Sequence, residues 1–359
     1  MSTDASDEFP GLSTVALRDL VKDAITLLGP ETTAEACVKA FGSRSALLAQ
    51  LKRSFTLGKR ESRLFGLSEA IRRFGYPDTG SLMELERKVS ELKRGIAVYG
   101  LFTAEIGIGQ SARRSAQALA TLGIPVSTHN IRLSQFENTV EFPCSPDFIS
   151  EYDSTLIHLN PDTLLWLFKN SPLEAFLGRR RIGFWHWELP VFPPQWARAL
   201  ETTHEIWVPS NFTARAVRAA GGASVRVVPH AVETDQISTS FARAQLGLPA
   251  DDFLLLTMFD LNSWPARKNP WGAYRAFMNA FPRQGASSPR LVVKCHGRAN
   301  RTAGLEPLLR DLREAPNVIF LDEVLSCERT RLLQAACDCF VSLHRSEGFG
   351  LPLLECMAL

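Results

Sequence analysis

The sequence lacks a strong net charge and any long apolar run. Its 359 residues contain 40 Lys and Arg against 38 Asp and Glu, a formal net charge of +2. Proteins that bind nucleic acid mainly through its phosphates carry a strongly basic face, so we do not expect a nucleic-acid partner. No apolar run approaches the ~18 to 20 residues of a membrane-spanning helix. The first residues, Met1 to Glu8, are acidic rather than typical of a signal peptide, and we expect a soluble, cytoplasmic protein.

The sequence also lacks the features of a disulfide framework or a metal centre. Its seven cysteines are odd in number and scattered, and Cys295 and Cys339 fall in apolar strand patterns, which favours reduced, packed thiols. Cys337 and Cys339 flank Asp338, and strand alternation predicts that both thiols pack on one buried face rather than bind a metal. There is no Asp-x-Asp pair and no His and carboxylate set with metal spacing. We therefore predict no metal and no cofactor.

Length and composition predict two domains and an appendage. With 359 residues, 45% of them hydrophobic, the chain can bury more than one core. Residues 1–93 have no strand-helix rhythm and predict a helical N-terminal extension, for example a helix at Leu82 to Leu92 with Ser81 as N-cap and Glu84 in capping-box spacing. Between Lys52 and Arg94, eleven Lys and Arg oppose six Asp and Glu, which favours a solvated helical face over a membrane-surface patch.

From about residue 94 short apolar strands alternate with helices, a pattern typical of a parallel, doubly wound α/β sheet. We predict a Rossmann-like domain over 94–233, a linker over 234–250, where the periodicity is lost, and a second Rossmann-like domain over 251–359. The predicted strands cover residues 96–99, 124–127, 155–159, 182–185, 205–208, 225–228, 253–258, 291–294, 318–321 and 339–343. The predicted helices cover residues 109–122, 195–203, 211–220, 270–280, 306–314, 327–336 and 351–359.

The second half contains four predicted strands where a doubly wound half commonly has about six, so we expect its C-terminal end to be incomplete. Two Rossmann-like halves place a ligand cleft between them.

The segment from Glu347 to Glu355 is the strongest candidate site. It places two carboxylates eight residues apart, around a turn containing Gly348 and Gly350. The helix predicted after the turn has Pro352 in its first turn and offers free N–H groups and a positive dipole end, which suits a diphosphate. Glu355, one turn into that helix, can accept hydrogen bonds from a diol such as ribose, and Glu347 can reach further hydroxyls. The alternative interpretation is a plain strand-to-helix turn with two surface acids.

A second candidate follows the first strand of the second half, where Arg267 and Lys268 precede a helix beginning at Pro270. A guanidinium fork and an ammonium can hold phosphate oxygens, and we favour that role over an incidental basic pair.

Two weaker candidates lie in the first half. Gly107, Gly109 and Ala112 fit the G-x-G-x-x-A dinucleotide spacing, which permits an NAD-dependent oxidoreductase. The glycines come late after the strand, and the second strand ends without the acid that would hold an adenosine ribose, so an acceptor or phosphate loop is favoured. At another strand end, His186 could donate to a sugar hydroxyl and Glu188 could orient an acceptor, although packing in the core is an equal alternative for the histidine.

These residues resemble the retaining, nucleotide-sugar-dependent glycosyltransferases of family 4, which have the two-Rossmann GT-B fold. The resemblance rests mainly on Glu347-Gly-Phe-Gly-Leu-Pro-Leu-Leu-Glu355 preceded by an apolar strand. Further matches are 208–210 (Val-Pro-Ser), 227–233 (Val-Val-Pro-His-Ala-Val-Glu) and 267–270 (Arg-Lys-Asn-Pro), and the resemblance covers roughly residues 96 to 359.

The resemblance implies a hexosyltransferase of polysaccharide biosynthesis that transfers a sugar from a nucleotide-diphosphate sugar to a saccharide or lipid-linked acceptor with retention of configuration. Together with the strand-end position of His186, it leads us to predict catalytic roles for Glu347, His186 and Lys268. It implies donor-binding roles for the residues Arg267, Lys268, Gly348, Phe349, Gly350, Leu351 and Glu355. Peripheral membrane association is left open.

The sequence departs from the family at two positions. Many relatives carry an Arg several residues before the residue that corresponds to Lys268, whereas residues 260–264 here are Asp-Leu-Asn-Ser-Trp, and Ala231 stands where the family usually has Gly. It also lacks the family's last strands and returning helix. The alternative is therefore a catalytically impaired nucleotide-sugar-binding fragment or scaffold.

Overall fold

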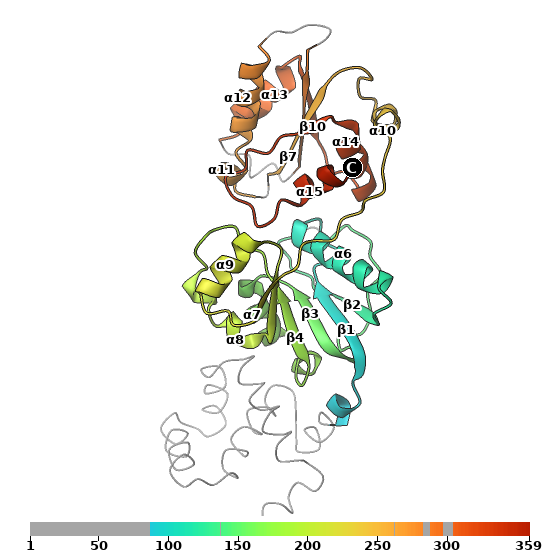
Figure 1. Ribbon diagram of the computed structural model, residues 1–359, viewed down its shortest axis with the longest axis vertical. Helices are drawn as coiled ribbons and strands as arrows, with labels where there is room; N and C mark the ends of the chain where they lie inside the picture. Colours follow the sequence, from blue (N-terminus) through green and yellow to red (C-terminus); the bar gives the residue numbers. More distant parts are fainter. Residues whose placement is uncertain (1–86, 137, 262, 283–287, 297–303) are drawn as a thin grey trace, which may run out of the picture. The chain divides into compact units, whose positions relative to one another are not determined.

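The computed structural model describes residues 87–136, 138–261, 263–282, 288–296 and 304–359 (Figure 1). Of the helix predicted at Leu82 to Leu92, residues 87–90 are helical, whereas Ser81, Leu82 and Glu84 lie outside these ranges, as does the rest of the predicted extension up to residue 86. The chain divides into two compact units: the first runs to Pro229 without Trp187–Leu189, and the second combines those three residues with His230–Leu359. Within the described ranges, we find no helix whose length and apolarity would carry it across a bilayer.

The first unit contains a six-stranded, all-parallel sheet in the order β2-β1-β3-β4-β5-β6. Its strands are β1 (Lys93–Gly100), β2 (Val126–Asn130), β3 (Tyr152–His158), β4 (Arg180–Phe184), β5 (Glu205–Val208) and β6 (Val225–Val227). Its helices are α6 (Gly107–Thr121), α7 (Pro161–Asn170), α8 (Ala199–Thr202) and α9 (Asn211–Ala219), with short 3-10 turns η2 (Leu173–Ala175) and η3 (Pro194–Trp196).

Both faces of the first sheet are buried. Val98 and Leu156 pack with Ala112 and Ala116 of α6 on one face. On the other, Tyr99 contacts Phe176, which in turn contacts Phe168 of α7. Because consecutive residues of a strand point to opposite faces, this double burial explains the continuous apolar runs that predicted the strands.

The second unit contains a four-stranded, all-parallel sheet in the order β10-β7-β8-β9. Its strands are β7 (Leu254–Asp260), β8 (Arg290–His296), β9 (Val318–Asp322) and β10 (Cys339–Phe340). Its helices are α10 (Thr239–Leu246), α11 (Pro265–Lys268), α12 (Pro270–Ala280), α13 (Glu306–Glu314), α14 (Cys327–Ala336) and α15 (Leu351–Ala358) (Figure 1).

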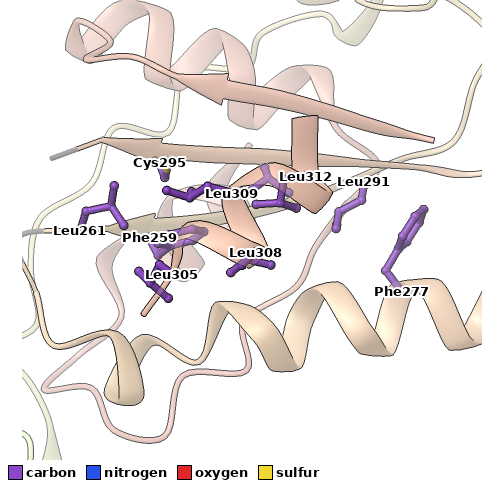
Figure 2. Packing of buried hydrophobic residues seen from close by; sticks show 10 residues of the cluster. Phe259, Leu261, Phe277, Leu291, Cys295, Leu305, Leu308, Leu309 and Leu312 are labelled. Atoms are coloured by element: carbon purple, nitrogen blue, oxygen red, sulfur yellow. The ribbon is translucent and has the colours of Figure 1, made fainter. Parts of the chain in front are cut away.

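The second sheet is also covered on both faces. In Figure 2, Leu308, Leu309 and Leu312 of α13 lie against the strand residues Phe259 and Leu291 in one buried cluster. The opposite cluster joins Leu254, Leu256 and Val292 to Leu333 of α14. The two parallel sheets with helices on their faces confirm the predicted α/β class of two Rossmann-like units.

The structure differs from several local predictions. The segment 234–250, predicted as a linker, contains α10, whose Arg243 donates to the carbonyl of Ala336 at 2.9 Å and pairs with Asp338 at 2.7 Å. The predicted strand 339–343 is observed as the two residues of β10, Cys339 and Phe340, which pair with β7. Cys339 is consequently exposed, so the prediction that it shares a buried face with Cys337 is wrong.

Two further differences concern helices. The helix predicted at 195–203 is divided into η3 and α8. α6 begins at Gly107 rather than Gly109, so both glycines lie in a helix rather than a loop.

Candidate functional site

The strand order of the second unit brings the two strongest predicted motifs together. From β7 the chain continues to β8 and β9 on one side, while β10 lies on the other side of β7. In open α/β sheets, ligands bind at the carboxyl ends of strands beside such a change of direction. The segments that follow β7 and β10 leave this edge, and they carry Arg267, Lys268 and Glu347.

Backbone and side-chain hydrogen bonds hold these two segments side by side. The amide of Arg345 donates to the carbonyl of Arg267 at 2.8 Å, and Asn269 Nδ2 donates to the carbonyl of Leu343 at 2.9 Å. The Arg345 guanidinium donates to the carbonyl of Ala266. Asn269 adopts φ +45°, a left-handed conformation that Asn tolerates, and this residue separates α11 from α12. The basic pair is therefore fixed relative to Glu347 by non-covalent bonds across 79 sequence positions.

Five charged or ionisable side chains form what we call the charge cluster: Glu188, Arg267, Lys268, His344 and Glu347. Glu347 Oε1 accepts from Lys268 Nζ and from His344 Nδ1, the latter at 2.7 Å. Arg267 Nη1 lies 2.8 Å from Glu188 Oε1 and 3.6 Å from Glu347 Oε2. All five belong to the second unit, since Glu188 lies in its segment Trp187–Leu189.

Burial and neighbouring charges shift the pKa values of Glu347 and Glu188 in opposite directions. Burial raises the pKa of Glu347, but hydrogen bonds from His344 and Lys268 and the charge of Arg267 outweigh it and lower this pKa to about 2. Burial raises the pKa of Glu188 above its ordinary value, Arg267 opposes this rise, and the charge of Glu347 adds to it. Glu347 is therefore a permanent anion at neutral pH, and Glu188 is the acid of the pair that protonates first.

The turn between Glu347 and α15 has the conformation that its glycines predict. Gly350 adopts φ +84° and caps α15, a region that residues with a side chain rarely occupy. Pro352 occupies the first turn of the helix, where its missing N–H costs nothing. Pro352 has no N–H and the amide of Leu353 donates to the carbonyl of Gly350 at 2.9 Å, so the first amides that this helix can offer to an anion are those of Gly350 and Leu351. Both residues follow closely after Glu347, which Lys268 contacts at this sheet edge.

Glu355 lies in α15 and is buried, with 8% of its surface exposed. Its Oε2 accepts from Gln334 Nε2 of α14 at 2.9 Å. The Oε1 of the same Gln334 is buried and has no hydrogen-bond partner among the described residues. Gln334 therefore orients the carboxylate of Glu355, whose contact with a ribose stays a prediction.

The structure brings some of the predicted site residues together and leaves others apart from them. Arg267, Lys268 and Glu347 contact one another, and Glu188 joins them through Arg267. His186 lies in the first unit, where its amide donates to Asn160 Oδ1 at 2.9 Å and its ring stacks on Phe184. Its catalytic role and that of Glu188 toward an acceptor stay predictions.

Packing explains one of the two glycines at the start of α6, Gly109. A side chain at Gly109 would lie 2.5 Å from the carbonyl oxygen of Leu101 and 2.7 Å from that of Ala104. Close backbone approach therefore requires Gly109, whatever binds nearby. A side-chain carbon at Gly107, the first residue of α6, would meet no atom within 4 Å, and a contact of this residue with an acceptor or a phosphate stays a prediction.

Sequence reasoning missed four residues around this site. His344 and Ser263 hold Glu347 and Arg267, the latter through Arg267 Nη2 donating to Ser263 Oγ at 2.6 Å. Gln334 holds Glu355, and His230 contacts Phe349. A polar Gln within the apolar pattern of α14 and a His three residues before Glu347 were available signals. Among the residues described, no three His, Cys, Asp or Glu side chains gather as a metal-binding group.

Comparisons with solved structures identify the architecture. The Anabaena HepE (Alr3699) structure in complex with UDP and glucose superposes with a TM-score of 0.52 at 17% identity, covering 74% of this chain and 78% of HepE. The catalytic domain of starch synthase IV from Arabidopsis thaliana, bound to ADP and acarbose, gives a TM-score of 0.52 at 11% identity, covering 74% of this chain and 81% of that domain. The chain has the GT-B fold.

At these identities the likeness extends to the GT-B fold alone. No protein-family model matches the sequence, and a comparison with curated proteins finds no match. The residues of the site must therefore carry any statement about what this GT-B chain does.

Proposed function

We propose that the chain is a nucleotide-sugar-dependent glycosyltransferase and that its second unit binds the donor. The observation that carries the proposal is the convergence of Arg267 and Lys268 with the glycine turn and the first amides of α15 at one sheet edge. This arrangement offers a guanidinium, an ammonium and helix amides to one anion. Each of these three kinds of donor binds phosphate oxygens strongly.

The carboxylates of the charge cluster support this role. Glu188 and Glu347 hold Arg267 and Lys268 in place without a ligand, so less side-chain freedom is lost when a diphosphate arrives. The same ion pairs compete with the ligand for the cations. The HepE structure contains UDP and glucose, and that of starch synthase IV contains ADP. We expect a uridine, adenosine or guanosine diphosphate sugar as the donor here.

The proposed reaction breaks the bond between the sugar's anomeric carbon and the diphosphate oxygen. The bonding electron pair leaves with the diphosphate, whose added negative charge is stabilised by Lys268, Arg267 and the amides of α15. The acceptor hydroxyl attacks the anomeric carbon from the face that the diphosphate leaves, and its proton passes to a departing phosphate oxygen. This sequence retains the anomeric configuration.

In this proposal Glu355 accepts hydrogen bonds from the ribose, and Glu347 accepts hydrogen bonds from the transferred sugar while it stays ionised. The acceptor is a saccharide or a lipid-linked saccharide. No cofactor or metal ion is part of the proposal, and the cytoplasm is the expected compartment.

Calorimetric titration with UDP-, ADP- and GDP-sugars tests donor binding. Replacing Lys268 or Glu355 by Ala removes a hydrogen bond involving a charged group, worth roughly 1.5 to 3 kcal/mol, so Kd should rise about 10- to 150-fold. Lys169→Ala, an exposed lysine in the last turn of α7, and Glu314→Ala, an exposed acid in α13, are the matched controls. Unchanged Kd in Lys268→Ala and Glu355→Ala would refute the assigned roles.

Product analysis separates transfer from binding alone. The chain is incubated with the donor and a pool of saccharide and lipid-linked acceptors, and products are detected by mass spectrometry. Nuclear magnetic resonance of the new anomeric proton then reports retention or inversion. Donor binding without any product would favour the catalytically impaired binding protein instead.

A further inference from the structure

The glycine turn of the proposed donor site is packed against a residue outside both motifs. The rings of His230 and Phe349 lie 4.9 Å apart between centroids and are nearly perpendicular, at 86°. His230 has only 8% of its surface exposed. Phe349 is the side chain between Gly348 and Gly350, so its ring is the point at which packing can hold this turn.

The segment that begins with His230 also contacts the C-terminal end of α15, the helix that follows the glycine turn. Gln236 Nε2 donates to the carbonyl of Ala358, in the last turn of α15, at 2.9 Å. Residues 230 to 236 therefore contact both the turn that precedes α15 and the end of α15. Such a segment fixes the position of the helix as well as that of the turn.

The same segment is anchored to α14. Arg331 pairs with Glu233, and its Nη2 donates to the carbonyl of Asp235 at 2.9 Å. Helix α14 also carries Gln334, which orients Glu355 of α15. The segment 230–236 and α14 therefore both hold α15 and the turn before it, the first through His230 and Gln236 and the second through Gln334. The segment is thus attached to the body of the second unit rather than only to α15.

We propose that His230 is a positioning residue for the donor diphosphate: its ring holds Phe349, and thereby keeps the Gly348–Gly350 turn in the conformation that presents the first amides of α15. The proposal rests on the proposed function. A turn with two glycines has many alternative conformations, and restricting them before the ligand binds lowers the entropic cost of binding. His230 acts through Phe349 and does not touch the donor.

Three variants of the full chain test this role. His230→Ala removes the ring, and His230→Phe keeps an aromatic ring at the same place. Phe320→Ala, in β9 at the opposite edge of the same sheet from β10, removes a partly buried aromatic ring as a control for loss of packing. Two quantities are measured: deuterium uptake by the amides of residues 346–352 without any nucleotide, and Kd for the UDP-, ADP- or GDP-sugar that the wild type binds.

We expect His230→Ala to increase deuterium uptake in 346–352 and to raise Kd about two- to tenfold, since an aromatic pair is worth roughly that factor. His230→Phe should restore the deuterium uptake and the Kd to within about twofold of the wild-type values, since it keeps the aromatic ring. Phe320→Ala should leave both unchanged.

Equal uptake in His230→Ala and the wild type overturns the positioning role, whether or not a donor binds. Increased uptake with an unchanged Kd also overturns it, and failure of His230→Phe to restore either value excludes ring packing as the cause. If the wild type binds none of the nucleotide sugars, the proposed function fails, and with it the link to a diphosphate, while the uptake measurement still decides whether His230 holds the turn.

Discussion

The charge cluster predicts how the stability of the second unit depends on pH through Glu347. We consider Glu347→Gln, which keeps the size of the side chain and removes its charge. The carboxylate accepts from Lys268 and His344 and lies 3.6 Å from Arg267, and these partners outweigh burial and lower its pKa from 4.5 to about 2. At ~1.4 kcal/mol per pH unit, this difference sets a ceiling of about 3 kcal/mol on the stabilisation at neutral pH.

Solvent reduces this ceiling, because a quarter of the Glu347 side chain is exposed. We expect Glu347→Gln to lower the free energy of unfolding by about 2 kcal/mol at pH 7. The sign follows from the lowered pKa. The folded state binds a proton less readily than the unfolded state, so the stabilisation is complete above about pH 4.5 and is lost as the pH falls towards about 2.

The assay is urea unfolding of wild type and variant, followed by tryptophan fluorescence, at several pH values between 7 and 3. The gap between the two proteins should be constant from pH 7 to about 5 and should narrow below about 4.5. Glu314→Gln, an exposed acid in the last turn of α13, should show a difference of at most ~0.5 kcal/mol. A variant as stable as the wild type at pH 7, or a gap that does not narrow in acid, would show that these ion pairs do not stabilise the fold.

Three other predictions concern local structure. Gly350→Ala puts a side chain at φ +84° and 3.1 Å from a methyl carbon of Leu353, so unfolding free energy should fall by about 1 to 2 kcal/mol, and circular dichroism melts that match the wild type would contradict this. Ser210→Ala removes the N-cap of α9 and should cost ~1 kcal/mol by urea unfolding, whereas Ser210→Asp should keep most of it. Burial raises the pKa of Cys295 to about 12, so iodoacetamide at pH 8 should label the exposed Cys327 first, and mass spectrometry showing the reverse order would contradict the packing of β8.

The first residue of a helix could be predicted correctly from the sequence where the sequence carries a clear start signal. α12 and α13 begin as predicted, with a proline in their first turns, and α14 begins after Ser326, whose Oγ accepts from the amide of Arg329. These signals are local in sequence. They therefore need no knowledge of tertiary structure.

Elements that depend on distant partners were predicted poorly. α10 has a small buried face, formed by Ala242 and the stem of Arg243, and Arg243 is held by residues nearly a hundred positions away. β10 pairs with β7 over two residues, although the apolar run from Cys339 to Leu343 predicts five, so the extent of pairing rather than propensity sets its length. Neither cause is visible in a sequence window of ten residues.

The candidate site divides in the same way. The sequence placed Arg267, Lys268 and Glu347 at one edge because each follows a strand, and parallel strands bring their carboxyl ends together. The contacts of His344 with Glu347 and of His230 with Phe349 depend on side-chain packing across folded segments, which sequence spacing does not determine.

Donor binding by the second unit is decided by calorimetric titration of the wild type and Lys268→Ala with UDP-, ADP- and GDP-sugars. We predict that the wild type binds at least one donor and that Lys268→Ala binds it about 10- to 150-fold more weakly, while Lys169→Ala matches the wild type. No binding of any donor by the wild type, or equal affinity in Lys268→Ala, would contradict the proposed donor site.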